Sequence, residues 1–248
     1  TTDTQGVFAF RAMTFGNEWN LPIGYVVLAE SGFTSSTLKL FNTTNGALVG
    51  TISTSKPATM PNWSPDGTKL VYVGCDGSAS VLEASDCSLY TQTWNPATQT
   101  FSGETLLASN SAGTTLYYPT FSPDSAWVAY NSAQEWTDAS GNPWVSNANP
   151  RAKLMMISAS GGPQIELAEA NGVGDLTNSW PRWAPTAGGT GWLAWSTSRD
   201  YGHTTSDLAQ LWVSEIDFAA ASSGQDPSSP PATVRSRAGH PPTRVGET

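Results

Sequence analysis

Charged side chains are scarce in this sequence. Only 12% of the 248 residues are charged, and 11 Lys and Arg stand against 20 Asp and Glu, which gives a formal net charge of −9. An average domain carries roughly twice that share of charge. The basic residues are few and scattered, and they form no stripe that could neutralise a phosphate backbone. We therefore expect no nucleic-acid partner, and the acidic excess is typical of a surface that prevents aggregation.

Long apolar runs and metal-binding residue types are scarce as well. The longest apolar runs, such as Gly24–Ala29, have the length of a strand and fall short of the roughly 20 residues that a membrane-spanning helix needs. We expect no membrane insertion. Glycine-rich nucleotide motifs are missing, and both His lie far from the two Cys, so we expect neither a cofactor nor a metal. No signal peptide is visible at Thr1, which indicates a processed or trimmed start.

Tryptophan and glycine, by contrast, are abundant. The sequence has 11 Trp and 23 Gly, a composition that suits a chain of short strands and tight turns. The aromatic content is too high for a disordered body.

An internal repeat organises the chain. Three segments share a proline, any residue, an aromatic residue, a small residue and a second proline. They are Pro61-Asn62-Trp63-Ser64-Pro65-Asp66-Gly67, Pro119-Thr120-Phe121-Ser122-Pro123-Asp124-Ser125 and Pro181-Arg182-Trp183-Ala184-Pro185-Thr186. Proline presets the first corner of a β-turn, aspartate caps the turn, and glycine accepts positive φ. Each copy therefore predicts strand A, a turn and strand B, with the aromatic residue facing inward. We expect Trp63, Phe121 and Trp183 to occupy equivalent positions.

Apolar runs at matching distances predict the remaining strands. An Asn45-Gly46 turn between two such runs adds an earlier, degenerate unit, and Gly6–Met13 is interpreted either as its strand A or as the end of a lost blade. The other expected strands are Tyr25–Glu30, Thr37–Phe41 and Ala47–Ser53; Leu70–Val73, Ser88–Thr93 and Thr100–Ala108; Trp127–Tyr130, Lys153–Ile157 and Gln164–Ala168; and Trp192–Trp195 and Gln210–Ile216.

The repeat resembles a known family. The run from Trp63 to Tyr72, which begins Trp-Ser-Pro-Asp-Gly, is similar to the repeat of TolB-like propellers, and Phe121–Asp124 matches it again. The third copy keeps only the aromatic residue and the prolines. The resemblance covers roughly residues 20–218 and implies an all-β fold, a partial or incomplete β-propeller of about four four-stranded antiparallel blades. Those blades would span about residues 6–54, 61–108, 119–168 and 181–218, where a TolB-like ring is expected to have six. It also implies a periplasmic or secreted, cell-envelope setting and protein partners.

The end of the chain differs from the rest. From Ala219 onward Ser, Pro, Ala and Gly dominate and the strand pattern disappears. We expect residues 219–248 to form a disordered or altered tail.

Cys75 and Cys87 flank a predicted loop between strands B and C. Antiparallel neighbours at the mouth of a loop lie at the distance that a disulfide requires. We expect a disulfide that stabilises the fold by about 2–3 kcal/mol, with two unpaired thiols as the alternative.

Long insertions between strands B and C offer a candidate binding face. They are Cys75–Cys87, Ala133–Ala152 and Thr197–Ala209, and a meandering blade places them on one side. Loops on a rigid scaffold carry binding residues, and Trp, Tyr and Arg dominate binding hot spots. The candidate binding residues are Glu135, Trp136, Asp138, Trp144, Arg199, Tyr201 and His203.

Each candidate has a structural alternative. Trp136 and Trp144 could pack the loop's own small core, and Arg199 could pair with Asp200 at the surface while Tyr201 packs downward. Asp66 and Asp124 are interpreted as turn caps, because turns at the edge of a blade do not bring two carboxylates to one centre.

We expect no catalytic residues. His203 is the only histidine before the tail, and no Gly-x-Ser-x-Gly elbow occurs. The favoured hypothesis is an exported, non-catalytic propeller that binds a protein or peptide, not an enzyme in itself. The alternatives are the propeller part of a larger serine peptidase of the prolyl-oligopeptidase type, or a carbohydrate-binding propeller that uses Trp136 and Trp144.

Overall fold

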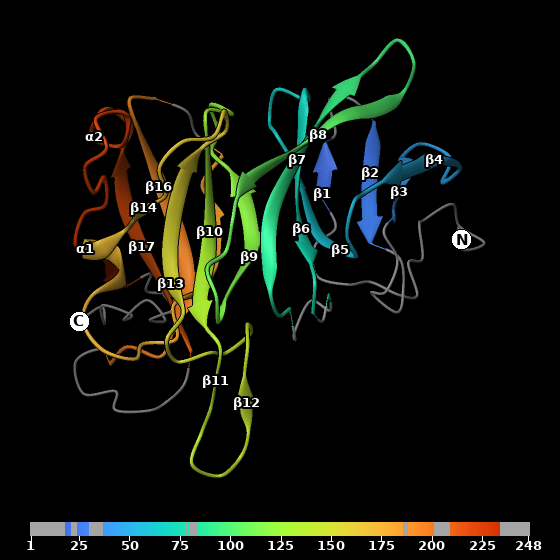
Figure 1. The fold of residues 1–248 in the computed structure, drawn as a ribbon. Helices are drawn as coiled ribbons and strands as arrows, with labels where there is room; N and C mark the ends of the chain where they lie inside the picture. The colour runs from blue at the N-terminus through green and yellow to red at the C-terminus, as the bar shows by residue number, and fades with distance from the viewer. Residues whose placement is uncertain are drawn as a thin grey trace, which may run out of the picture.

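Four antiparallel sheets follow one another along the chain (Figure 1). The computed structural model describes residues 18–20, 24–29, 37–77, 79, 84–185, 188–200 and 209–233. Within these residues each of these four sheets has four strands that pair in a meander, and a separate two-stranded sheet is inserted between the second and third strands of the third. This is the architecture of β-propeller blades, and the fold is an all-β propeller, as the sequence predicted. We number the sheets blades 1 to 4.

The strands of the blades have the following bounds. Blade 1 holds β1 (Glu18–Asn20), β2 (Tyr25–Ala29), β3 (Thr37–Asn42) and β4 (Leu48–Ser53). Blade 2 holds β5 (Ala58–Trp63), β6 (Lys69–Cys75), β7 (Cys87–Asn95) and β8 (Thr100–Ala108). Blade 3 holds β9 (Thr114–Phe121), β10 (Trp127–Gln134), β13 (Lys153–Ser158) and β14 (Ile165–Glu166). Blade 4 holds β15 (Ser179–Trp183), β16 (Thr190–Thr197), β17 (Gln210–Asp217) and β18 (Ala232–Thr233).

The repeated motif forms the turn between strands A and B. Trp63, Phe121 and Trp183 each pair with an early residue of strand B, namely Leu70, Val128 and Leu193. Each is followed by the same backbone hydrogen bond, donated by the N–H of residue 64, 122 or 184 to a carbonyl of strand B, at 2.8–2.9 Å. The three aromatic residues are therefore equivalent, as predicted.

Asp66 and Asp124 cap these turns. The Ser64 hydroxyl donates to Asp66 at 2.6 Å, and the N–H of Thr68 donates to the same carboxylate at 3.0 Å. Ser122 and the N–H of Ala126 repeat the pattern around Asp124. Partial burial opposes ionisation of Asp66, but the hydrogen bonds from Ser64 and Thr68 outweigh it and lower the pKa of that carboxyl. This arrangement is the turn-capping role that the sequence indicated.

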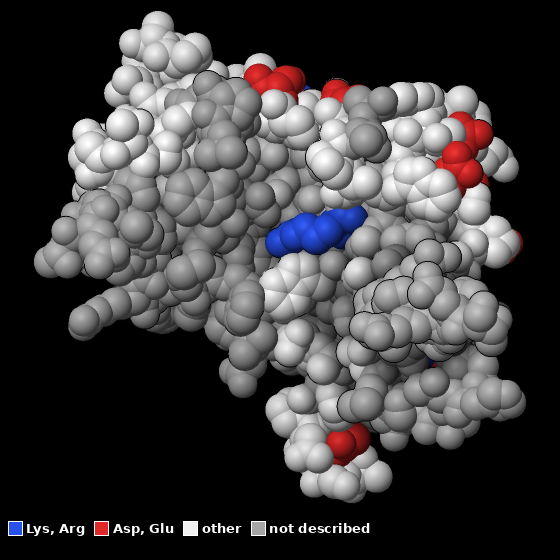
Figure 2. All heavy atoms as spheres, turned by 180° about the vertical axis from the view of Figure 1, so that it is seen from behind, with Lys and Arg blue, Asp and Glu red and all other residues white. Residues whose placement is uncertain are grey.

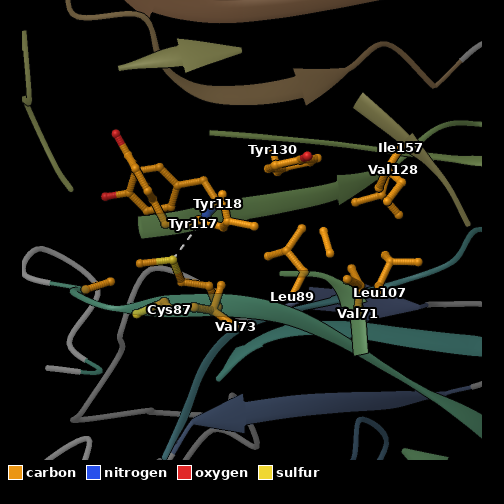
Figure 3. Close-up of a cluster of buried hydrophobic side chains, with 14 of the residues drawn as sticks. Val71, Val73, Cys87, Leu89, Leu107, Tyr117, Tyr118, Val128, Tyr130 and Ile157 are labelled. Carbon is orange, nitrogen blue, oxygen red and sulfur yellow. Dashed lines mark hydrogen bonds between the residues drawn. The ribbon is translucent and has the colours of Figure 1, made fainter. Parts of the chain in front are cut away.

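The hydrophobic core lies between successive blades. Side chains alternate along each strand, so Leu70 and Tyr72 of β6 pack toward blade 1, whereas Val71 and Val73 pack toward blade 3. Figure 3 shows the cluster between blades 2 and 3, in which Val71, Val73, Leu89 and Leu107 face Tyr117, Tyr118, Val128, Tyr130 and Ile157. All nine side chains are at most 7% exposed. The loops at the ends of the strands are therefore held on a packed scaffold.

Two predicted strands were misplaced. Strand A of blade 1 is Glu18–Asn20, which pairs with Tyr25–Val27 through a short connection, and the predicted Gly6–Met13 lies outside the described residues. The predicted strand Gln164–Ala168 is reduced to Ile165–Glu166 and is followed by a short helix, α1 (Ala168–Asn171). Asp226 and Ser228 accept the N–H groups of Glu169 and Ala170, so the end of the chain, far away in sequence, stabilises a helical turn here.

The predicted tail was wrong for residues 219–233. Helix α2 (Phe218–Ser222) begins at Asp217, whose carboxylate accepts the N–H groups of Ala219 and Ala220. Phe218 and Ala221 are buried against blades 3 and 4, and β18 supplies the fourth strand of blade 4. The Ser-, Pro- and Ala-rich composition predicted disorder, but a helix cap and the burial of a few side chains are enough to order this segment. Residues 234–248 lie outside the described residues.

Candidate functional site

The insertion of blade 3 forms a hairpin that extends beyond the sheets. Strands β11 (Trp136–Thr137) and β12 (Pro143–Trp144) pair with each other and project from one end of blade 3 (Figure 1). The disulfide loop of blade 2 contacts the base of this hairpin. The N–H of Asp86 donates to the Glu135 carboxylate at 2.7 Å, and the N–H of Ala84 donates to the Ser146 hydroxyl at 2.9 Å. The insertions of blades 2 and 3 therefore meet on one face, as their positions predicted. We call the surface formed by these two insertions, Cys75–Cys87 and Ala133–Ala152, the loop face.

Asp138 organises the tip of the hairpin. Its carboxylate accepts hydrogen bonds from the N–H groups of Ser140 and Asn142, both at 2.9 Å, from the Asn142 side chain at 3.0 Å and from the Trp144 indole at 3.1 Å. Gly141 takes a φ of 87°, which a residue with a Cβ rarely adopts. The hydrogen bonds from Asn142, with those from Trp144 and Ser140, lower the pKa of Asp138 to about 2. The ionised carboxylate therefore fixes the shape of the turn.

The pKa of Asp138 predicts how the hairpin responds to acid. The ordinary pKa of an aspartate is ~3.9. A carboxyl whose pKa is lower in the folded protein stabilises the fold at any pH above ~3.9, and this contribution is lost as the pH falls through the folded-state pKa. With a pKa of about 2, the Trp144 indole resonance in a ¹H–¹⁵N NMR spectrum is expected to stay unchanged from pH 6 to pH 3. In Asp138→Asn the resonance should already differ at pH 6. A half-change near pH 4 in the wild type would contradict this assignment.

The two tryptophans of the hairpin pack against each other. The rings of Trp136 and Trp144 stack with centroids 6.5 Å apart and an interplanar angle of 17°. The guanidinium carbon of Arg151 lies 4.2 Å from the centroid of Trp136. Both tryptophans are half-buried. Their main contacts are therefore within the loop itself, which was the alternative to a binding role. Each ring still keeps part of its surface exposed on the loop face.

A buried asparagine fixes the base of the hairpin. The Asn149 side chain is fully buried and donates to the carbonyls of Gln134, Trp144 and Val145 at 2.9–3.3 Å. Its side-chain oxygen accepts the N–H of Arg151 at 2.9 Å. This one side-chain amide thus connects both ends of the insertion and positions Arg151 over the Trp136 ring.

Beside the hairpin lies a cleft of about 350 Å³ between blades 3 and 4. Arg151 and Asp175 face each other across it, with Nε and Oδ2 3.9 Å apart and side chains 41% and 62% exposed. Lys153 adds an ammonium group that pairs with Glu166 at 2.9 Å. The lining residues are Thr114, Ser132, Gln134, Arg151, Ala152, Lys153, Asn171, Gly172, Gly174, Asp175 and Asn178. The cleft therefore offers charged groups of both signs together with amides and hydroxyls.

Two buried asparagines form a rigid part of the cleft wall. Asn171 exchanges hydrogen bonds with the backbone N–H and carbonyl of Leu154 at 2.7 and 3.1 Å. The Asn178 side chain donates to the Asn171 carbonyl at 3.0 Å and accepts the Trp195 indole N–H at 3.1 Å. Because every one of these groups is satisfied within the protein, the wall has a fixed shape.

Arg199 braces this wall from behind. Its Nη2 donates to the carbonyls of Ala170 and Asn171 at 2.8 and 2.7 Å, and its guanidinium lies 5.0 Å from the Trp212 ring. Burial lowers the pKa of Arg199. These contacts, rather than a pair with Asp200, hold the guanidinium, so Arg199 is placed to support the cleft. Tyr201 and His203 lie outside the described residues.

The structure thus brings four of the seven predicted binding residues together, namely Glu135, Trp136, Asp138 and Trp144. Sequence reasoning missed Arg151, Lys153, Asp175 and Asn178, which form the cleft. Their positions were the only signal: Arg151 and Lys153 stand where the insertion of blade 3 rejoins the sheet, and Asp175 and Asn178 lie in the connection from blade 3 to blade 4.

A second cavity lies away from the loop face. It has a volume of about 450 Å³ and sits between the outermost strands of blades 1 and 2, β4 and β8. None of the predicted binding residues lines it. Figure 2 shows the molecule from behind, where the described surface is mainly uncharged, with acidic groups toward its margins and one basic patch near the middle.

Two further features, a metal-ligand cluster and a membrane-spanning helix, are not found in the described residues. Within the described ranges, no three His, Cys, Asp or Glu side chains gather into a group that could hold a metal ion. None of the helices in the described part of the chain is long and apolar enough to cross a membrane.

Comparisons with known proteins place the fold. No protein-family model matches the sequence, and no curated protein matches it. Among solved structures, a luciferin-regenerating enzyme is 8% identical with a TM-score of 0.51, the match covering 90% of this chain and 60% of that one. An oligogalacturonate lyase in complex with manganese is 14% identical with a TM-score of 0.50, over 82% of this chain and 50% of that one. TolB from Acinetobacter baumannii is 14% identical with a TM-score of 0.49, over 88% and 45%.

The chain thus spans about half the length of the solved structures that it matches. At identities of 8–14% the similarity concerns the fold alone, since one propeller fold carries many functions. With its four meandering sheets, the chain is a β-propeller.

Proposed function

We propose that this chain is a TolB-like propeller that binds a protein or peptide on its loop face and has no catalytic activity of its own. The observation that carries the proposal is the cleft between blades 3 and 4, which combines a guanidinium, an ammonium and a carboxylate with a rigid amide wall. Such groups recognise peptide backbone, side-chain charges and chain ends. The repeated Ser-Pro-Asp turns support the TolB-like assignment.

The setting that we propose is the periplasm or another oxidising compartment of the cell envelope. Cys75 and Cys87 form a disulfide, and disulfides persist outside the reducing cytosol. An exported propeller would meet its partner there.

The hairpin favours a protein partner over a sugar. Trp136 and Trp144 stack on each other, and Arg151 lies over Trp136, so no fully open ring is presented as a flat platform for a pyranose. Half-buried aromatic side chains beside an arginine are typical of a protein-binding hot spot. The rigid hairpin would then contact the partner next to the cleft.

Charge reversal in the cleft tests this proposal. We expect Arg151→Glu to weaken capture of the partner from envelope extract by about 30-fold, because a hot-spot residue contributes about 2 kcal/mol or more. Lys39→Glu is the matched control, since Lys39 lies on β3 of blade 1, where its ammonium group donates to Thr51, and does not line the cleft. Binding would be measured by titrating the captured protein against each immobilised variant.

Two outcomes would count against the loop face. Equal capture by wild type and Arg151→Glu, with loss in Lys39→Glu, would place binding elsewhere. Retention by a glycan array, with no protein captured, would favour the carbohydrate-binding alternative.

A further inference from the structure

The cavity between β4 and β8 lies at the outer rim of blades 1 and 2 and has a volume of about 450 Å³. Residues 49–53 of β4 form one side, residues 98–104 at the β7–β8 turn and on β8 form the other, and Leu40 and Gln92 complete the lining. We call this cavity the rim cleft. The hairpin of β7 and β8 extends beyond its sheet here (Figure 1). The volume of the rim cleft is within the range of about 300–1,000 Å³ that is typical of small-molecule sites.

A β-bulge directs Glu104 to the rim cleft. Between Thr91 and Thr93 the pairing of β7 with β8 shifts by one residue, and such a bulge changes the direction of the side chain next to it. The Glu104 carboxylate accepts the N–H of Ser55 at 3.0 and 3.1 Å and the Tyr72 hydroxyl at 2.5 Å. The carboxylate is therefore held in one position where it lines the cleft.

The negative charge of Glu104 is not needed to pack the blades. Tyr72 and Tyr130 are equivalent, because each stands two residues after the strand-B residue that pairs with the repeat aromatic. The Tyr130 hydroxyl donates to the Gln164 side chain at 2.6 Å, and that amide donates to the Ser109 carbonyl at 3.0 Å. Blade 3 thus makes the same link to the preceding connection with a neutral side chain. A carboxylate at this position in blade 2 therefore indicates a role beyond packing.

Gln92 adds an acceptor beside this carboxylate. Its side chain is 4% exposed, and its amide nitrogen donates to the Ser53 carbonyl at 2.8 Å and to the Tyr72 hydroxyl at 3.0 Å. An amide has two N–H donors and one acceptor oxygen, so the oxygen is the group that Gln92 has left for a ligand. The equivalent residue of blade 3 is the buried Ile157, since each pairs with the strand-B residue that also pairs with the repeat aromatic. The rim cleft thus has a polar floor where the next pair of blades has an apolar core.

Gly50 leaves the opposite side of the cleft open. It lies inside β4, and its φ is outside the left-handed region that favours glycine. A Cβ at this position would meet no atom within 4 Å. Neither the backbone conformation nor the packing therefore requires glycine here, although glycine weakens a strand. A glycine inside a strand is typical of a site where a ligand approaches the backbone closely.

We propose that the rim cleft binds a neutral sugar. Glu104 and Gln92 present acceptor oxygens to the hydroxyl groups of a pyranose ring. Hydroxyl side chains that can donate or accept line both sides, namely Thr51, Ser53, Thr98, Thr100 and Ser102. The half-buried Phe101 ring is held by Trp63 and Trp94, with centroids 4.9 Å away in both cases. This ring gives the C–H groups of the sugar an apolar surface.

The charges at the rim cleft favour a neutral ligand over an amine or an acid. Glu104 is the only charged side chain among the described residues that line it. The Lys39 ammonium group lies at its edge, where it donates to the Thr51 hydroxyl at 3.3 Å. A cationic ligand would be repelled by Lys39 and an anionic ligand by Glu104, whereas a neutral sugar is repelled by neither. The site is separate from the loop face, so the proposal goes beyond partner binding.

NMR titration of the ¹⁵N-labelled chain tests the proposal. The probes are glucose, N-acetylglucosamine, maltose and cellobiose, each added to about 20 mM, because an open site that makes few contacts is expected to bind in the millimolar range. We expect at least one of these sugars to shift the backbone amide of Gly50 and the side-chain amide of Gln92. The Trp144 indole of the loop face should not shift.

Variants that keep the fold identify the site. Gly50→Val fills the cleft and should weaken sugar binding at least about 10-fold, with a melting temperature no lower than that of the wild type, since valine suits a strand better than glycine. Gly189→Val is the matched control, because a Cβ at Gly189 also meets no atom within 4 Å and this residue lies outside the cleft. It should bind sugar like the wild type. Glu104→Gln keeps the link that Gln164 makes in blade 3 and should weaken binding about 5-fold, because it removes the charge from the acceptor.

Four results would each overturn the proposal. They are no shift with any of the four sugars, shifts confined to residues outside the rim cleft, full binding by Gly50→Val, and a response to putrescine or acetate at the rim cleft without a response to sugar. Partner capture by Gly50→Val should equal that of the wild type, which separates this result from the proposed function. Glycan retention that is equal in Gly50→Val and the wild type would place sugar binding elsewhere and also overturn the proposal.

Discussion

Truncation of Trp195 to alanine is expected to lower the free energy of unfolding by about 3–5 kcal/mol. Trp195 is 0% exposed and packs between blades 3 and 4. Its indole N–H donates to Asn178 at 3.1 Å, so the variant also removes a partner from the buried amide in the cleft wall. A cavity and a lost buried hydrogen bond both act in the same direction. Chemical denaturation followed by circular dichroism would measure the change.

Trp192→Ala is the matched control for this prediction. It removes the same side chain from the same strand, but Trp192 is 47% exposed and points away from the core. We expect a loss of about 0.5–1 kcal/mol. Trp195→Phe should fall between the two, because it keeps most of the ring and loses the hydrogen bond. Equal losses in Trp195→Ala and Trp192→Ala would refute the assignment of Trp195 to the inter-blade core.

The repeat made most of the fold predictable. A Pro-x-aromatic-small-Pro turn is local chemistry: the Ser64 hydroxyl, the Asp66 carboxylate and the N–H of Thr68 are within five residues of one another. Strand β8 has the predicted bounds Thr100–Ala108, because it is bounded by a turn on one side and polar residues on the other. Features decided by neighbouring residues in the chain could be read from the sequence.

Features decided by distant residues could not. Helix α1 forms because Asp226 and Ser228, more than 50 residues later, accept its first N–H groups. The cleft exists because Arg151 and Asp175 come from different connections and meet only in the folded chain. The sequence placed the loops on one face, but it gave no means of distinguishing Arg199, which braces the wall, from Arg151, which lines the cleft.

Replacement of both cysteines by alanine is expected to lower the free energy of unfolding by about 2–3 kcal/mol, the chain-entropy value for a loop of this length. Cys75 and Cys87 stand opposite each other where β6 and β7 end, with Cα atoms 4.0 Å apart, and both side chains are fully buried. Alanine keeps the site apolar, so the main loss is the cross-link. Thermal and chemical denaturation, each compared with the disulfide-bonded wild type, would measure it, and the reduced wild type should resemble the double variant.

The disulfide should also control the loop face, because the loop that it closes contacts the hairpin through Asp86–Glu135 and Ala84–Ser146. In the double alanine variant we expect faster amide hydrogen exchange at Ala84 and Asp86 and across residues 135–146, and weaker partner capture. Glu135→Ala provides the contrast, since it breaks one loop contact, leaves the disulfide intact and should cost about 1 kcal/mol or less. If the double variant unfolded like the wild type, or lost stability with no change in exchange at the hairpin, the disulfide would not connect the blade to the binding face. Equal hairpin exchange in Glu135→Ala and wild type would show that Ala84–Ser146 alone carries the coupling.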